Sequence, residues 1–205
     1  MAAAQLSAPA STKHKFFTLR IYATSTAQLL PRTLHFTILE PSRTMRLLHY
    51  NTDGGFSLAE FFEGDIPKKY AILSHRWGAE EATFKDLTDG TSKGKAGHGK
   101  IQFCGEQARR DGLQYFWVDT CCIDKSNAVE LQEAINSMFR WYQKATRCYV
   151  YLSDVSIRKR KASDTSAEYT WESALRASEW FKRGWTLQEL IAPASVDFFS
   201  KEGEL

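Results

Sequence analysis

The stretch RGWTLQELIAP, residues 183–193, sets Trp185 and Glu189 four positions apart in a segment with helical spacing. Four residues make about one helical turn, so both side chains are predicted to lie on the same side of the helix. Glu189 could therefore act in catalysis beside an indole, or it could be a surface glutamate next to a packed tryptophan. On the second interpretation the apolar stripe consists of Leu187, Leu190 and Ile191. The stretch alone favours that second interpretation.

Polar and aromatic side chains follow an apolar run in YAILSHRWG, residues 70–78. Ser74, Arg76 and Trp77 offer a hydroxyl, a guanidinium and an indole just before Gly78, which suits phosphate binding and base stacking. Each residue also has an ordinary structural role. Trp77 can cover the core, Arg76 can pair with an acid, and Ser74 can hydrogen-bond its own turn.

The run YFWVDTCCIDK, residues 115–125, ends a buried segment with Asp119 and Asp124. Inside a strand, the carboxylate of Asp119 would be costly unless it were hydrogen-bonded or paired. Two explanations stay open. Asp119 pairs with Arg76 or caps a neighbouring turn, or it binds a ligand hydroxyl.

GKAGHGKI, residues 94–101, has the glycine and lysine spacing of a phosphate-binding P-loop. However, position 101 is Ile, where a Ser or Thr would bind magnesium, and the preceding KDLTDGTSK is no buried strand. We therefore predict a flexible loop without nucleotide hydrolysis, in which Lys95, His98 and Lys100 attract an anion weakly.

The cysteines have neither the spacing of a zinc site nor the density of a disulfide scaffold. They are Cys104, Cys121, Cys122 and Cys148. We predict reduced core thiols and no metal site. Cys121 and Cys122 could form a redox pair, but in a strand they would point to opposite faces.

Strand-like apolar runs alternate with helical patterns from about residue 70 onward. The strand-like runs are 70–77, 115–123, 148–155 and 196–200, and the helical segments are about 100–112 and 127–145. The first helix is expected to stop at Gly112. The second helix opens with a capping-box pattern at Asn127 and Glu130. Its apolar positions are Leu131, Ile135, Met138, Phe139, Tyr142 and Ala145.

This alternation predicts an α/β domain with a mostly parallel sheet flanked by helices. Ligands in such sheets collect at the carboxyl ends of the strands. The places to look for a site are therefore Ser74–Gly78 and Asp119–Asp124.

The composition is that of a globular protein with one core. The chain has 205 residues, 43% hydrophobic and 25% charged, with a net charge of +3. No apolar run approaches the ~20 residues of a membrane helix, so no membrane span is predicted. The net charge is too small to indicate a nucleic-acid partner.

Two segments differ from this pattern. Residues 1–44 hold no acid before Glu40, which suits either a transit peptide or an extension upstream of a true start at Met45. We favour the extension, followed by a domain over 45–205 that we expect to be truncated at its C-terminal end. Residues 156–169 carry four consecutive basic residues, which we interpret as a hydrated loop rather than a nuclear-import signal.

Three blocks resemble the signature blocks of the fungal heterokaryon incompatibility (HET) domain, in the same order. They are YAILSHRWG, the run from YFWVDTCCIDK to YVYLSD, and SEWFKRGWTLQELIAP. The resemblance covers about 45–205, and MRLLHYNTDG resembles the start of the HET-E and HET-D group of vegetative incompatibility proteins. It implies a cytoplasmic cell-death signalling module of fungal innate immunity. In that group the domain precedes NACHT and WD40 sensor modules, so such modules, self-association and incompatibility partners are the expected interactions.

HET domains are also similar to TIR domains, which implies a TIR-like, flavodoxin-like architecture. Some TIR domains cleave NAD with a glutamate four residues after a tryptophan, the spacing of Trp185 and Glu189, although Thr186 stands where TIR domains often carry Cys. The resemblance thus implies NAD as a substrate, with no cofactor required and Glu189 catalytic. The implied binding residues are Ser74, Arg76, Trp77, Gly78, Asp119 and Trp185. The alternative is a self-assembling module without enzymatic activity that recruits death machinery.

Overall fold

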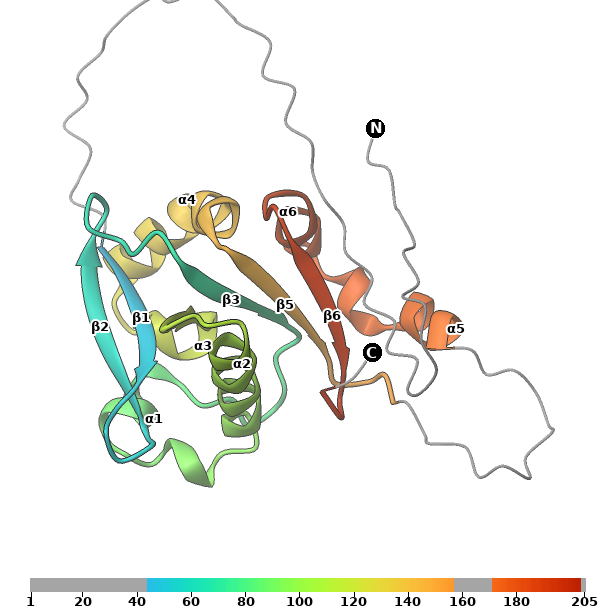
Figure 1. The fold of residues 1–205 in the computed structure, drawn as a ribbon, viewed down its shortest axis with the longest axis horizontal. Helices are drawn as coiled ribbons and strands as arrows, with labels where there is room; N and C mark the ends of the chain where they lie inside the picture. The colour runs from blue at the N-terminus through green and yellow to red at the C-terminus, as the bar shows by residue number, and fades with distance from the viewer. Residues whose placement is uncertain (1–43, 157–170, 204–205) are drawn as a thin grey trace, which may run out of the picture.

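Apolar runs rich in aromatic and β-branched residues build a central sheet of six strands (Figure 1). The computed structural model describes residues 44–156 and 171–203. The strands are β1 (Thr44–Tyr50), β2 (Phe56–Phe62), β3 (Tyr70–His75), β4 (Tyr115–Trp117), β5 (Arg147–Leu152) and β6 (Val196–Ser200).

Helices and helical turns connect these strands. The α-helices are α1 (Phe84–Thr88), α2 (His98–Arg110), α3 (Asp119–Cys122), α4 (Ala128–Lys144), α5 (Trp171–Ala177) and α6 (Thr186–Ile191). Two short 3₁₀ turns, η1 (Ser92–Gly94) and η2 (Glu179–Lys182), complete the described chain. Helix α2 ends at Arg110, two residues before Gly112, which adopts a φ of +70° and is the predicted stop.

The strand order is β2-β1-β4-β3-β5-β6. Strands β4, β3, β5 and β6 are parallel, whereas β1 and β2 form an antiparallel hairpin that joins the sheet through β4. The predicted α/β fold with a mostly parallel sheet is confirmed. The hairpin was not among the predicted strands.

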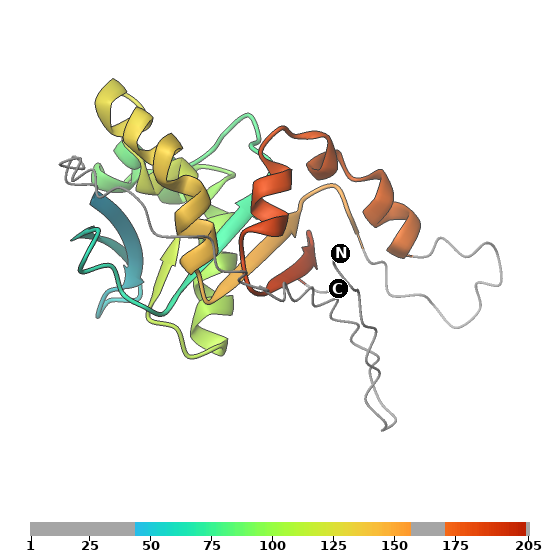
Figure 2. The same cartoon turned by 90° about the horizontal axis from the view of Figure 1, so that it is seen from above.

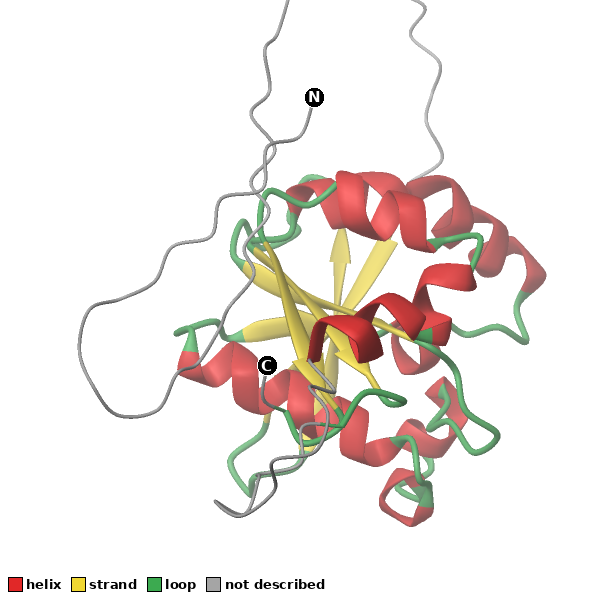
Figure 3. Cartoon of the chain, turned by 90° about the vertical axis from the view of Figure 1, so that its right-hand side faces the viewer, coloured by secondary structure: helices red, strands yellow, loops and turns green. Residues whose placement is uncertain are grey.

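Helices cover both faces of the sheet (Figure 3), with α2 on one face and α4 and α6 on the other (Figure 2). Neighbouring residues of β4 show why both faces are buried. Phe116 packs edge-on against Phe56 on the α2 side, and Trp117 packs against Trp141 and Tyr142 of α4. Successive strand residues point to opposite faces, so a strand covered on both sides needs large apolar residues at every position.

The order of the strands reverses at β3. Helix α2 leads from β3 to β4 on one side, and α4 leads from β4 past β3 to β5 on the other side. In an open parallel sheet, such a reversal leaves a crevice at the carboxyl ends of the strands. The polar residues that follow β3 and β4 lie at this edge.

Two details of the predicted elements are wrong. The segment 115–123 is a strand only as far as Trp117, and Asp119 opens the short helix α3. Cys121 and Cys122 therefore lie in one helical turn, not on alternate strand faces; both are free and buried, as are the other two cysteines. Burial raises the pKa of the Cys104, Cys121 and Cys148 thiols, which makes these three thiols unreactive.

Helix α4 buries only part of the stripe that its apolar spacing predicts: Tyr142 and Ala145 are buried, and Leu131 and Met138 pack against the core. Ala134, Ser137 and Trp141 face the core, while Ile135 and Phe139 are exposed. The capping-box pattern is half formed. The Asn127 side chain accepts hydrogen bonds from two backbone amides, but Glu130 instead binds the guanidinium of Arg46 on β1.

The predicted flexible loop at 94–101 is ordered, and its glycine at position 97 has a packing role. Helix α2 begins at His98, and Lys100 pairs with Glu81 instead of remaining available to an anion. A Cβ at Gly97 would lie 2.7 Å from the backbone Cα of Glu81 and 2.9 Å from the backbone nitrogen of Ala82. Gly97 therefore allows close backbone packing, whereas a Cβ at Gly94 or Gly99, the two glycines with P-loop spacing, would meet nothing within 4 Å.

Replacing Gly97 with alanine is expected to lower the free energy of unfolding by about 1–3 kcal/mol, because backbone atoms must shift to make room. Gly99→Ala is the matched control, since a Cβ there meets nothing within 4 Å. In a helix that substitution should stabilise by up to about 1 kcal/mol. Urea denaturation measures both, and equal effects of the two variants would contradict this account.

Among the described residues, no helix is long and apolar enough to cross a membrane. The expected upstream extension and the basic loop fall almost wholly on residues 1–43 and 157–170, which lie outside the described residues.

Candidate functional site

A pocket of about 410 Å³ opens at the carboxyl edge of the sheet, beside the ends of β3 and β4. Its volume lies within the ~300–1,000 Å³ usual for small-molecule sites. The lining residues are Arg76, Trp77, Asp119, Ile123, Lys125, Leu131, Ile135, Met138, Tyr142, Arg183, Trp185 and Glu189. The pocket therefore brings together five predicted site residues from three blocks of sequence: Arg76, Trp77, Asp119, Trp185 and Glu189.

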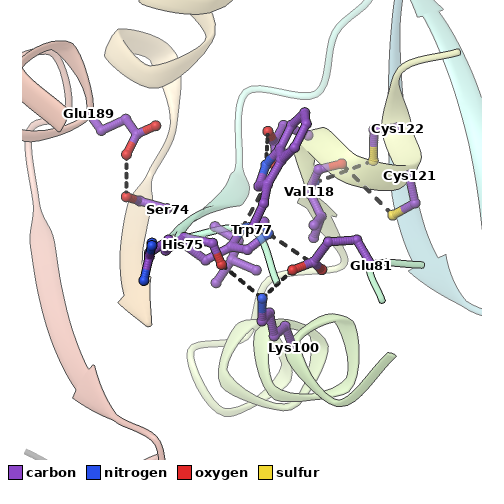
Figure 4. Close-up of polar contacts among 12 residues, drawn as sticks. Ser74, His75, Trp77, Glu81, Lys100, Val118, Cys121, Cys122 and Glu189 are labelled. Carbon is purple, nitrogen blue, oxygen red and sulfur yellow. Dashed lines mark hydrogen bonds and ion pairs between the residues drawn. The ribbon is translucent and has the colours of Figure 1, made fainter. Parts of the chain in front are cut away.

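Glu189 is the most enclosed charged group of the pocket, only 3% exposed. Arg183 binds its carboxylate with two nitrogens, at 2.9 Å and 3.0 Å. Ser74 at the end of β3 donates its hydroxyl to Oε2 at 2.6 Å, and the two side chains point toward each other in Figure 4. Trp180 in turn donates its indole N–H to the Ser74 oxygen at 2.8 Å. This network compensates the burial of the carboxylate.

The interpretation of Glu189 as a surface residue is wrong. Leu187 and Ile191, expected to form the buried stripe, are 66% and 55% exposed, and Trp185 is 47% exposed. The short helix α6 instead turns Thr186 and Glu189 inward. The polar partners supplied by β3 and by the segment before α6 make this inversion possible.

Trp77, Asp119 and Lys125 form the opposite wall. The indole N–H of Trp77 donates to Oδ2 of Asp119 at 2.8 Å, and the Lys125 ammonium lies 4.3 Å from the centre of the Trp77 ring. Lys125 also donates to the backbone carbonyl of Asp119 at 2.5 Å. The indole thus binds the Asp119 side chain in place of the Arg76 guanidinium, which was one of the alternatives left open by the sequence.

The pKa of Asp119 is raised to about 6, mainly by burial and also by the charge of Glu189, while Lys125, the Trp77 hydrogen bond and Arg183 act in the opposite direction. Its side chain is 18% exposed, so it remains in contact with the pocket. Asp119 thus changes its charge close to neutral pH, which is unusual for a carboxyl group.

The indole N–H resonance of Trp77 is expected to titrate with a midpoint near pH 6. The Asp119 carboxylate accepts a stronger hydrogen bond than the neutral acid, so the signal should move downfield as the pH rises through about 6. NMR of ¹⁵N-labelled protein measures this, with the buried indole of Trp117 as an internal control. The titration should vanish in Asp119→Asn; a Trp77 signal that is flat between pH 4 and 8 would contradict the raised pKa.

His75 lies directly behind this wall and is fully buried. Its Nδ1 is 3.8 Å from Asp119 Oδ1 and its Nε2 is 3.8 Å from Glu81 Oε2, both beyond hydrogen-bond distance. Burial lowers the pKa of His75 well below its usual value, with contributions from Lys100, Arg183 and Lys125. The imidazole is therefore neutral at physiological pH.

The remaining predicted residues support the pocket or lie outside its lining. Ser74 sits behind Glu189, and the backbone N–H of Gly78 donates to Glu81 at 2.5 Å. Asp124 caps the turn at Ser126 with a bond of 3.0 Å to the backbone amide. Gly78 and Asp124 therefore shape the loops around the site.

Sequence reasoning missed Arg183, Lys125 and the apolar wall that α4 contributes through Leu131, Ile135 and Met138. Arg183 precedes Glu189 by six residues, a spacing that no regular helix brings together; the turn at residues 184–185, between η2 and α6, lies between them. The apolar spacing of α4 was visible in the sequence, but it predicted contacts with the core rather than with a pocket.

The pocket combines three basic and two acidic side chains with aromatic and aliphatic walls. Such a lining suits a ligand that carries phosphate, hydroxyls and a flat ring. In the described part of the chain, no group of three or more His, Cys, Asp or Glu side chains is arranged to hold a metal ion.

Comparisons with known proteins bear on this site. Residues 70–168 match the family described as Heterokaryon incompatibility protein (HET). The chain is also 57% identical over 161 residues to the vegetative incompatibility protein HET-E-1 of Podospora anserina. This match covers 77% of the chain and 12% of the relative, so the chain spans only a small part of that protein's length. No solved structure matches the chain, and the TIR-like resemblance stays a prediction.

Proposed function

Since the chain belongs to the heterokaryon incompatibility family, we propose that it acts in heterokaryon incompatibility as a cell-death effector that cleaves NAD in the pocket around Glu189. The observation that carries this proposal is that the buried carboxylate of Glu189 lines a pocket with basic and aromatic walls. A buried charge that lines a cleft is a common feature of catalytic sites.

The walls of the pocket offer partners for each part of the nicotinamide nucleotide. The Arg76 guanidinium can bind phosphate, and Trp77 or Trp185 can stack on the ring. Ser74 and Arg183 occupy three of the roughly four acceptor positions of the Glu189 carboxylate, which leaves one on Oε1 for a ribose hydroxyl.

Cleavage of NAD demands little of the protein. Nicotinamide leaves a cationic bond as a neutral molecule, so the step needs no general acid, unlike most glycoside hydrolysis. The positive charge that develops on the ribose is the main cost. In this mechanism Glu189 stabilises that charge from a fixed position in a water-poor site.

Glu189→Gln is expected to lower nicotinamide release from NAD about 100-fold, because the amide keeps the shape but not the charge. Purified chain and NAD are incubated, and nicotinamide is measured by chromatography against a protein-free control. Glu179→Gln is the matched control, because Glu179 also has a basic neighbour, Lys182, but lies outside the pocket with a side chain that is 43% exposed. Equal release by Glu189→Gln and wild type would remove Glu189 from the mechanism.

A second candidate function is assembly without catalysis. Helix α6 exposes Leu187 and Ile191, and α4 exposes Phe139, three large apolar side chains outside the pocket lining. Exposed apolar side chains that gather into a patch can form a contact surface for other proteins. On this account the domain self-associates through α6 and recruits death machinery.

Cell death on expression of the chain separates the two functions. The enzymatic proposal expects Glu189→Gln to abolish killing and Leu187→Glu to preserve nicotinamide release. The assembly proposal expects the reverse: killing survives Glu189→Gln and is lost with Leu187→Glu, together with the oligomer in size-exclusion chromatography.

A further inference from the structure

The pocket holds a second carboxylate, Asp119, and its surroundings differ from those of Glu189. Two nitrogens of Arg183 bind Glu189 directly. Asp119 instead accepts a hydrogen bond from the indole of Trp77 at Oδ2, while Oδ1 lies 3.8 Å from a neutral imidazole nitrogen of His75. One carboxylate is therefore ion-paired, and the other has neutral hydrogen-bond surroundings.

The charges around Asp119 are mixed and come from several elements. Lys125 follows α3, and Arg183 precedes α6; both favour the ionised form. Burial and the charge of Glu189 favour the protonated form, and together they raise the pKa of Asp119 to about 6. His75 of β3 is neutral and does not change this balance. Near neutral pH a useful fraction of Asp119 therefore carries a proton.

Two carboxyl groups that face one pocket from different environments are the usual arrangement of an acid and a stabilising base. We propose that Asp119 is a general acid, and that the pocket also cleaves N-glycosidic bonds to neutral purine bases such as adenine. This inference rests on the proposed function, because it uses the same pocket and the same role of Glu189.

The chemistry of the leaving group explains why a general acid matters. Nicotinamide departs from a cation and needs no proton, whereas adenine would depart as an anion unless a ring nitrogen is protonated first. The carboxyl group of Asp119 can supply that proton from the pocket wall. The indole faces of Trp77 and Trp185 and the apolar side of α4 suit either ring.

The reaction needs no co-reactant other than water. The Asp119 carboxyl group gives its proton to a ring nitrogen of the base while the bond between C1′ and the base breaks, and the bonding electron pair goes to the base. Glu189 stabilises the oxocarbenium ion that remains. A water molecule then adds to C1′ and returns one proton to Asp119, which restores the starting state.

The test compares two substrates in one preparation of the whole chain. NAD reports nicotinamide release, and adenosine monophosphate reports adenine release, both by chromatography between pH 5 and 8. Adenine release should fall about tenfold for each pH unit above 6, because the acid loses its proton. Nicotinamide release should stay flat over the same range.

Asp119→Asn is expected to lower adenine release at least about 100-fold and nicotinamide release less than about tenfold. Asp124→Asn is the matched control, since Asp124 caps a turn outside the pocket lining. Circular dichroism verifies that each variant folds. If Asp119→Asn does not fold, the pH profile of the wild-type chain still decides.

Each outcome has one meaning. Acid-dependent adenine release that is lost in Asp119→Asn supports the general acid. Nicotinamide release without adenine release overturns this inference and leaves the proposed function standing, as does adenine release that is independent of pH or undiminished in the variant. If neither base is released, both proposals fail.

Discussion

Replacing Arg183 with methionine is expected to lower the free energy of unfolding by about 3 kcal/mol, because the substitution leaves a buried carboxylate without its cation. The guanidinium supplies two of the three hydrogen bonds to Glu189, and the side chain of Glu189 is only 4% exposed. Ser74 remains as a donor, so the loss should lie at the low end of the range for broken buried pairs, about 3–5 kcal/mol.

A matched control lies one residue earlier. Lys182→Met removes a cation whose side chain is 67% exposed and which pairs with the surface residue Glu179. Exposed pairs of this kind contribute about 0–1 kcal/mol, so this variant should unfold close to the wild-type midpoint in urea. The contrast tests burial directly, since both substitutions replace a basic residue with methionine.

The double variant Arg183→Met with Glu189→Gln decides whether charge is the cause. Glutamine carries no charge to leave unpaired, so the double variant should recover most of the stability lost by Arg183→Met alone. If the double variant is as unstable as the single one, the aliphatic stem of Arg183 matters through packing, and the ion pair contributes little.

The position of the candidate site was predictable from the sequence, whereas the contacts between its side chains were not. Parallel strands that end in polar residues place those residues at one edge, which brought Arg76, Trp77 and Asp119 together as expected. The pairing of Arg183 with Glu189 depends on the turn at residues 184–185 between η2 and α6, and local spacing carries no signal for it.

The error at α6 has a definite physical cause. Apolar periodicity assumes that the buried face of a helix is the apolar one, and in a helix of six residues this assumption is weak. Tertiary partners reversed it: Ser74 and Arg183 made it favourable to bury Glu189, while Leu187 stayed in solvent. The strand predicted through Asp119 was wrong beyond Trp117, because the chain turns into α3 at Asp119.

Trp180→Ala is expected to have the largest effect on stability, about 3–5 kcal/mol, because the indole is 1% exposed and its removal leaves a large cavity. The ring packs edge-on against Phe181 and Phe198, and its N–H binds Ser74 directly behind Glu189. Loss of Trp180 should therefore weaken both the core and the support of the pocket.

Two further variants separate these contributions. Trp180→Phe keeps much of the volume but removes the donor to Ser74, so it should lower the free energy of unfolding by about 1–2 kcal/mol and still lower nicotinamide release.

Trp185→Ala truncates a tryptophan that is 47% exposed at the pocket. It should change the free energy of unfolding by less than about 1 kcal/mol while weakening ligand binding. Thermal and urea unfolding measure the first quantity, and the KM for NAD measures the second. If Trp185→Ala destabilises the fold as much as Trp180→Ala, the division of these two tryptophans between core and pocket is wrong.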